Sequence, residues 1–265
     1  MNTFVFDIET VPDIEGGKRL FGLEGLSDDD VAHAMYQIRR QETGGSDFLR
    51  HHLHRIVCIS AVLRTRDGFK VWSLGDEKSD ERDLITRFFA GIERYNPTLV
   101  SWNGGGFDLP VLHYRAMLHG ITAGKYWDQG EDDRDFKFNN YISRYHSRHT
   151  DLMDLLSLYQ ARAAQPLDQI ASLLGFPGKM GMSGAKVWDA YLAGDIAGIR
   201  NYCETDVLNT WLVYLRFQLM RGNILMPAYE EEVELVKQTL QKEAKPHFTE
   251  FLEAWAKNTP KLTTP

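Results

Sequence analysis

The chain has little of several features that would assign it to a broad class of protein. It contains two cysteines in 265 residues, Cys58 in a strand-like run and Cys203 in a helix-like one. We interpret both as buried thiols rather than as a bridge or a metal site. The longest apolar runs, such as residues 56–63, are far too short to span a bilayer, so no membrane partner is expected.

The beginning of the chain and its charge speak against two further classes. Residues 1–7 carry neither a basic region nor a cleavable small-residue site. No secretory signal is therefore expected, and the expected location is cytoplasmic. The formal net charge of −7 speaks against a protein that coats nucleic acid by bulk electrostatics. It does not exclude a nuclease, because bound divalent ions invert the charge of a carboxylate-lined site.

What the chain does contain is a series of strands with interleaved helices, followed by a helical half. The expected strands are residues 3–8, 55–63, 69–74 and 98–102. The expected helices are residues 80–95, 109–118, 151–159, 167–174, 185–193, 195–220 and 230–256. Residues 126–149 are expected to be irregular. This order predicts an α/β fold in which helices flank a mixed sheet.

The domain organisation follows from the same reading. Residues 1–225 are expected to form the main domain. Within it, the polar residues 16–53, with a helix over 27–40, are interpreted as an insertion between the first two strands. Residues 226–265 are expected to form a C-terminal helical extension, whose function the sequence does not indicate.

The first expected strand ends in two acids. Because side chains alternate along a strand, Asp7 and Glu9 project from the same face, while Phe6 and Ile8 enter the core. Two like charges roughly 7 Å apart are costly unless a cation lies between them. Their oxygen ligands suit magnesium or manganese. The alternative is an edge strand that ends in solvated acids.

Two later segments carry acids at positions suited to the same chemistry. Residues 101–110 end a strand in a glycine turn that lets the backbone approach a ligand, and Asp108 follows at the start of a helix. An N-cap is an equally good reading of Asp108. Tyr202 and Asp206 are four residues apart and share one helix face. The carboxylate can bind a metal while the phenol reaches its bound water, although an ordinary amphipathic helix is the alternative.

In this order, the three segments resemble the DEDDy 3′–5′ exonucleases. Their signature is Asp-x-Glu on the first strand, Asn-x-x-x-Phe-Asp after a later strand and Tyr-x-x-x-Asp on a late helix. The most specific matches are Phe-Asp-Ile-Glu-Thr at residues 6–10 and Tyr-Cys-Glu-Thr-Asp-Val at 202–207. The chain most resembles the predicted exonucleases related to the proofreading domain of family B DNA polymerases, over roughly its first four-fifths.

The resemblance implies a ribonuclease H-like fold and removal of nucleoside 5′-monophosphates from the 3′ end of single-stranded DNA. It implies that Asp7 bridges two divalent ions, Mg²⁺ or Mn²⁺. Glu9 and Asp206 would complete the site of the ion that binds the attacking water, and Asp108 would support the second ion. Two ions about 3.5–4 Å apart can activate a water and stabilise the leaving 3′ oxygen.

One detail indicates the subtype. The sister DEDDh group has a histidine five residues before the last aspartate, and that position is Asn201 here. The resemblance therefore implies that Tyr202 orients the nucleophilic water. No polymerase segment follows the motifs, so a free-standing enzyme of repair, degradation or end trimming is expected.

Possible substrate contacts lie beside the motif acids. Thr10, Asn103 and Phe107 would flank the terminal nucleotide, although an inward core Phe107 is an equal alternative. Lys179, near Lys186, offers a second phosphate contact.

A second group of possible contacts lies in residues 139–149. There, Arg144 and Arg148 alternate with Tyr141 and Tyr145, a mixture that suits a single strand. A solvent-exposed polar loop is the alternative reading of this segment.

Some polar clusters are left out of the expected site. His51, His52 and His54 lack the partners of a zinc pattern and are interpreted as solvated loop residues. Asp151 and Asp154 are interpreted as capping residues.

Three other functions remain open on the sequence. The first is an exoribonuclease with the same site, since treatment of the 2′-hydroxyl cannot be read here. The second is a catalytically silent nucleic-acid-binding module, which the presence of all four acids disfavours. The third is a small-molecule phosphohydrolase, which the loop rich in arginine and aromatic residues disfavours.

Overall fold

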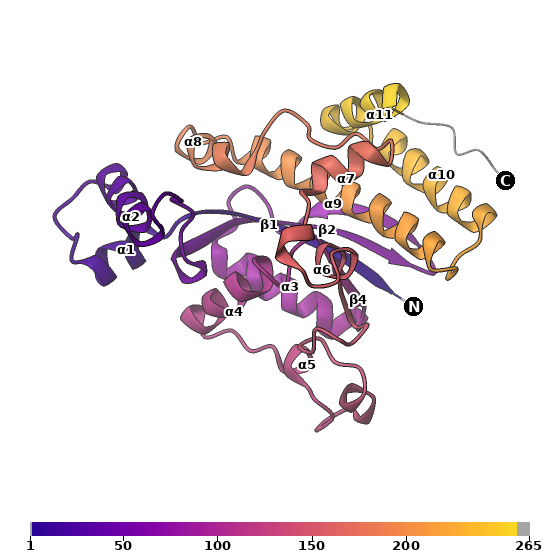
Figure 1. The fold of residues 1–265 in the computed structure, drawn as a ribbon, viewed down its shortest axis with the longest axis horizontal. Coiled ribbons are helices and arrows are strands. Elements are labelled where there is room, and N and C mark those ends of the chain that lie inside the picture. Colours follow the sequence, from indigo (N-terminus) through magenta and orange to yellow (C-terminus); the bar gives the residue numbers. More distant parts are fainter. Residues whose placement is uncertain (1, 259–265) are drawn as a thin grey trace.

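A five-stranded sheet forms the centre of the molecule in the computed structural model, which describes residues 2–258 (Figure 1). The strands are β1 (Thr3–Pro12), β2 (His54–Thr65), β3 (Gly68–Ser73), β4 (Thr98–Ser101) and β5 (His149–Asp151). Their order is β3-β2-β1-β4-β5. The first three strands pair antiparallel, and β4 and β5 add to β1 in parallel. This mixed sheet with flanking helices confirms the predicted fold class.

Helices cover both faces of the sheet. One face carries α3 (Glu81–Tyr95) and α4 (Asp108–His119), and the other carries α7 (Leu167–Leu173) and α9 (Ile196–Met220) (Figure 1). Phe4, Phe6 and Ile8 of β1 enter the first core, while Val5 enters the second. The alternation of β1 therefore joins the two cores through one strand.

The C-terminal helices are α10 (Met226–Glu243) and α11 (Pro246–Asn258). The sequence predicted a single helix over 230–256, which is wrong. Ala244 has a left-handed backbone (φ 50°), and Pro246 restricts Lys245 to a non-helical conformation. Both helices pack against α9 and share its core. Residues 259–265 of the predicted extension lie outside the described residues.

Residues 14–53, between β1 and β2, hold α1 (Ile14–Phe21) and α2 (Asp28–Thr43), which project from one end of the molecule (Figure 1). They have a small core of their own, centred on Val31, Met35 and Leu53. The remaining helices are α5 (Gly124–Trp127), α6 (Leu152–Leu156) and α8 (Val187–Leu192). The 3-10 turns are His51–Leu53, Arg134–Lys137, Ala161–Ala163 and Gly184–Lys186.

Two local predictions are corrected here. Residues 149–151 were expected to be irregular or helical, but they form β5, which pairs with β4. Three residues are too few to show the alternation of a strand. His54 is not a solvated loop residue: it is the buried first residue of β2. Among residues 2–258, no helix is long and apolar enough to cross a membrane.

Candidate metal-binding active site

The central part of β1 presents two acids to the face covered by α9. Asp7 and Glu9 lie opposite the core side chains Phe6 and Ile8, as the alternation of the strand requires. The β1–β2 ladder shifts register between Glu9 and Thr10. Bulges of this kind commonly redirect a strand beside an active site. Glu9 is buried and Asp7 is half-buried.

Asp108 reaches the same strand from α4. Because β1 pairs with β4 only over residues 3–5, the backbone of Ile8 lies beyond the end of that ladder. The Ile8 amide donates to Asp108 Oδ1 at 3.1 Å. Asp108 is the first residue of α4, where the helix dipole favours an acid, and Phe107 is the N-cap. The alternative reading of Asp108 as the N-cap is therefore wrong by one position, and the carboxylate lies against β1.

Helix α9 supplies the other two predicted catalytic residues. Tyr202 and Asp206 lie one turn apart on α9, and the phenol lowers the pKa of Asp206, although burial raises it by more. Between them, Cys203 directs its thiol toward Asp7, with its Sγ 3.5 Å from Asp7 Oδ2. The sequence identified Cys203 as a buried thiol, which is confirmed, but not its contact with the site.

One cavity of about 460 Å³ collects all five predicted catalytic residues. Its lining also includes Asn103 and Phe107 of the glycine turn, together with the following residues: Ile8, Trp102, Met153, Ala164, Gln165, Pro166 and Leu167. Residues separated by almost 200 positions in the sequence thus meet beside the central part of β1.

Burial and mutual repulsion oppose ionisation of the four acids. Burial raises the pKa of Asp108 to about 7, and it raises that of Asp206 to about 7 as well. For Asp7 the pKa lies well above its ordinary value, through burial and then through the charges of Asp108 and Asp206. Burial, and then the charge of Asp7, also raise the pKa of Glu9 well above its ordinary value. A cation bound among these carboxylates would remove this cost.

The donor set fits a hard divalent ion. Ligand atoms of Asp7, Glu9 and Cys203 lie within 4.8 Å of one another. Burial raises the pKa of Cys203, so this residue remains a thiol that donates to Asp7. The carboxylate oxygens are the ligands that Mg²⁺ and Mn²⁺ prefer. Lys179 lowers the pKa of Asp206, but this effect is smaller than that of burial.

The glycine turn between β4 and α4 is held by an acid that the sequence reading had left out. The Asn103 and Gly105 amides donate to the two carboxylate oxygens of Asp151, at 3.0 and 2.8 Å. Asp151 also caps α6, as predicted. A Cβ at Gly104 would lie 2.3 Å from Ser101 Oγ, so the turn requires glycine there. Asp151 thereby positions the segment that leads to Asp108.

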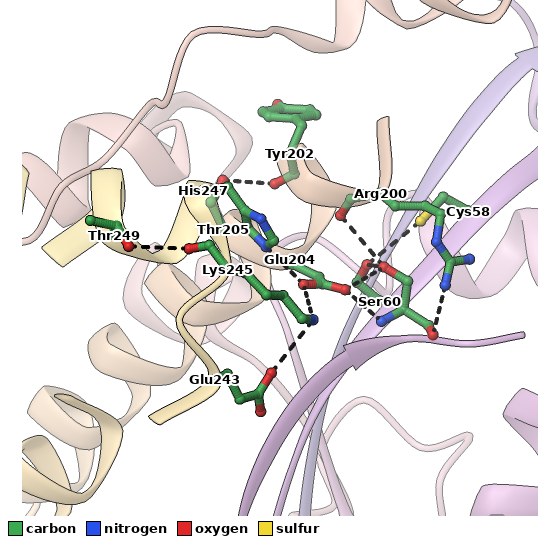
Figure 2. A network of polar contacts seen from close by, with 11 residues as sticks. Cys58, Ser60, Arg200, Tyr202, Glu204, Thr205, Glu243, Lys245, His247 and Thr249 are labelled. Atoms are coloured by element: carbon green, nitrogen blue, oxygen red, sulfur yellow. Dashed lines mark hydrogen bonds and ion pairs between the residues drawn. The ribbon is translucent and has the colours of Figure 1, made fainter. Parts of the chain in front are cut away.

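A buried network fixes the catalytic face of α9 from behind (Figure 2). Glu204 accepts hydrogen bonds from the Ser73 amide (2.9 Å) and hydroxyl (3.0 Å) on β3. It also contacts Lys245 (3.1 Å), in the link between α10 and α11, and His247 (2.9 Å), in the first turn of α11. In Figure 2, Tyr202 points away from this network. Glu204 therefore joins α9, β3 and the C-terminal helices, and no local pattern in the sequence indicated it.

The predicted substrate contacts are divided between two places. Asn103 and Phe107 line the catalytic cavity, and Phe107 also packs against the first core, so both readings of Phe107 hold. Thr10 hydrogen-bonds to His54 at 2.8 Å and lines a neighbouring groove. Lys179 is exposed and acts on Asp206 electrostatically.

Two predicted contacts are engaged elsewhere. Arg144 pairs with Asp154 at 3.0 Å. Arg148 donates to the Asn139 carbonyl at 2.6 Å and lies 4.0 Å from the centre of the Phe136 ring. Neither arginine lines the catalytic cavity. The structure therefore does not bring these two residues to the acids.

Comparison with known proteins assigns the chain to a family. Residues 46–255 match the family described as predicted 3′–5′ exonucleases related to the exonuclease domain of PolB. The chain belongs to this family. Asp108, Tyr202 and Asp206 lie within the matched range, and Asp7 and Glu9 lie upstream of it. No significant match is found among curated proteins.

A solved structure supports the fold of this member of the PolB-related family. The chain is similar to the family B DNA polymerase of the hyperthermophilic archaeon Pyrobaculum calidifontis, with a TM-score of 0.50 and 18% sequence identity. The similarity covers 83% of this chain and 24% of the polymerase. The chain thus spans about a quarter of that protein. With the sheet order above, this confirms the ribonuclease H-like fold.

Proposed function

We propose that this protein is a 3′–5′ exonuclease that removes nucleoside 5′-monophosphates from single-stranded DNA with two Mg²⁺ or Mn²⁺ ions. The observation that carries the proposal is the convergence of Asp7, Glu9, Asp108, Tyr202 and Asp206 on one cavity. Membership of a family of predicted 3′–5′ exonucleases supports it.

Each acid has a distinct place in the proposed mechanism. Asp7, whose pKa is raised by the charges of both Asp108 and Asp206, would hold both ions. Glu9 and Asp206 would complete the site of one ion, and Asp108 would support the other. When bound, such ions supply a reactive water and stabilise the leaving 3′ oxygen. The Ile8 amide and the Cys203 thiol hold the carboxylates of Asp108 and Asp7 in place.

Tyr202 acts on the water as a neutral hydrogen-bonding group. Burial raises the pKa of its phenol far above the ordinary value, and the charges of Asp206 and Glu9 raise it further. The hydroxyl therefore remains protonated at neutral pH and does not serve as a base. Tyr202 lies one helical turn before Asp206 on α9, and both line the catalytic cavity. With an ion held by Asp206, the Tyr202 hydroxyl would hydrogen-bond to the attacking water and orient it.

The terminal nucleotide occupies the catalytic cavity in this proposal. Asn103 and Phe107 stand beside the acids and contact its sugar and base. Lys179 is the nearest proposed phosphate contact, because its charge already acts on Asp206. Arg144 and Arg148 are omitted, since their guanidinium groups are held by Asp154 and Asn139.

The test uses 5′-labelled DNA and RNA single strands of one sequence, incubated with the protein and Mn²⁺. We expect a ladder that shortens from the 3′ end of the DNA and is absent with Asp7→Ala. Asp132→Ala is the control, because it removes an exposed acid that lines no catalytic surface. Cleavage of RNA alone would make the protein an exoribonuclease with the same mechanism. Binding of both strands without cleavage would make the protein a silent binding module.

A further inference from the structure

We propose that the groove between α2 and α8 binds the unpaired bases next to the terminal nucleotide, by stacking on aromatic side chains. The groove has a volume of about 760 Å³ and lies beside the catalytic cavity. The two share Ile8, Glu9 and Phe107, so a strand that leaves the acids can continue directly into the groove. The inference rests on the function proposed above and names where its substrate binds.

The walls of the groove carry aromatic rings. Tyr36 comes from α2, Phe48 from the segment after it, and Trp188 from α8. The Phe48 side chain is 54% exposed, although its ring lies 5.4 Å from that of Phe107. An aromatic ring left open beside a nucleic-acid site is a stacking platform, because every base has a π-face.

The charges in the groove favour bases over phosphates. Arg40 is paired with Asp47 at 2.7 Å, so its charge is already compensated. His33 lies 3.8 Å from Asp29, and the groove contains a further acid, Asp189. A channel for the phosphate backbone would instead present uncompensated cations. The lining therefore suits the apolar faces of unpaired bases.

The side of the groove near the start of β2 contacts the catalytic motifs directly. His54 hydrogen-bonds to Thr10, which follows Glu9 on β1, at 2.8 Å. His51 Nε2 lies 2.8 Å from the carbonyl oxygen of Gly106, in the turn before Asp108. The rings of His54 and Phe107 are in edge contact at 5.0 Å. These contacts fix the position of the groove relative to the acids. A nucleic-acid strand that passes from one to the other requires such a fixed arrangement.

The experiment compares a substrate that fills only the catalytic cavity with one that also reaches the groove. The first is the 4-nitrophenyl ester of thymidine 5′-monophosphate, and the second is an oligothymidylate of about ten nucleotides. For Phe48→Leu, which stays apolar but cannot stack, we expect the ratio of the two kcat/KM values to fall about 5- to 150-fold against the oligonucleotide. Phe48→Tyr should restore the ratio.

The matched control is Phe138→Leu, which alters a ring that is 78% exposed and lines neither cavity. This variant should keep the wild-type ratio. An unchanged ratio in Phe48→Leu would overturn the proposed stacking site. An equal loss on both substrates would overturn it too, because the residue would then act on the catalytic cavity.

A binding measurement separates this inference from the proposed function. The affinity of fluorescein-labelled oligothymidylate is measured by anisotropy, with calcium in place of the catalytic metal. We expect Phe48→Leu to weaken binding by a similar factor at low and at high salt, because stacking releases no counterions. Unaltered affinity would refute the groove. If the wild type binds through Phe48 but hydrolyses neither substrate, the proposed function fails and the groove stands.

Discussion

At the scale of single residues, the acids of the site oppose folding when no metal is bound. Asp108 and Asp206 have pKa values of about 7 in the folded protein, compared with about 4 in an unfolded chain. The folded state therefore binds more protons than the unfolded state over this interval. Its free energy of unfolding must fall as these carboxyls ionise.

Three fully or partly buried histidines change stability in the opposite direction at lower pH. Burial lowers the pKa values of His54, His113 and His149 to about 4, so the folded protein prefers their neutral forms. Their contribution to stability grows as the pH rises from about 4 to about 6.5 and is constant above. Above about pH 6.5, the carboxylates of the site therefore dominate the pH dependence.

The first prediction concerns the melting temperature in excess chelator. We expect it to fall between about pH 6.5 and about pH 8, and to recover when Mg²⁺ or Mn²⁺ is added. The recovery should be larger at the higher pH, where more carboxylates must be neutralised. Asp7→Asn should show a shallower fall. A melting temperature that is independent of metal at both pH values would contradict a metal site among these acids.

The second prediction concerns Tyr202, which differs in role from the acids. Tyr202→Phe should lower kcat by roughly 10- to 100-fold, the usual cost of a group that orients a ligand without binding the ion. Mn²⁺ affinity, measured by calorimetry, should change little. If this variant loses as much Mn²⁺ affinity as Asp7→Ala, the phenol is not a water-orienting group.

The residues that were predicted and those that were missed differ in the range of their contacts. Asp7, Glu9, Asp108, Tyr202 and Asp206 could be named because their three short segments, in order, resemble the signature of the DEDDy exonucleases. Other positions were missed or misplaced because their partners lie far away in the sequence: Asp151 (46 and 48 residues), His54 (44) and Glu204 (131). Only the fold brings such pairs together.

At the scale of elements, α9 carries the catalytic side chains on one face and is fixed by Glu204 on another. Burial alone would raise the pKa of Glu204, but His247 and Lys245 keep it below its ordinary value. Arg200 adds hydrogen bonds to four carbonyls at and after the end of β3, at 3.0–3.3 Å. The position of Tyr202 and Asp206 thus depends on contacts outside the cavity.

The third prediction tests this anchoring. Glu204→Ala should lower the free energy of unfolding by about 3 kcal/mol, because the buried Ser73 amide and the cations Lys245 and His247 lose their partner. Glu204→Gln keeps an acceptor for Ser73 and should lose less. Urea denaturation measures both. An alanine variant as stable as the wild type would show that the network does not hold α9.

The loop over residues 139–149 shows why a local pattern can mislead. The alternation of arginine with aromatic residues in 139–149 suggested a surface for nucleic acid. In the structure, Arg148 stacks on Phe136 and Tyr141, because the same cation–π contact also serves to pack a loop. Composition alone cannot separate these two uses. The contacts made by each guanidinium decide between them.

At the scale of the whole molecule, the C-terminal helices belong to the core that supports α9. Val236, Leu240, Phe248, Phe251 and Trp255 are all buried there. At about 1.5–3 kcal/mol each, their burial is comparable with the roughly 5–15 kcal/mol net stability of an ordinary domain. The expected boundary at residue 225 therefore has a direct test.

The fourth prediction is that a chain ending at residue 225 does not fold cooperatively. Removing α10 and α11 exposes the apolar side of α9 and leaves Glu204 without Lys245 and His247. Circular dichroism and thermal melting of the truncated chain, beside the full chain, measure the effect. A soluble truncated protein with a sharp melting transition would make the last helices a separate extension.

The central claim is that divalent metal at Asp7 releases the 3′-terminal nucleotide. It is tested most directly with a single DNA strand labelled on its last nucleotide, in Mn²⁺ and in excess chelator. The account predicts that labelled nucleoside 5′-monophosphate appears in Mn²⁺, and that neither the chelated protein nor Asp7→Ala releases it. Release of the label in chelator, or at an undiminished rate by Asp7→Ala, would contradict the account.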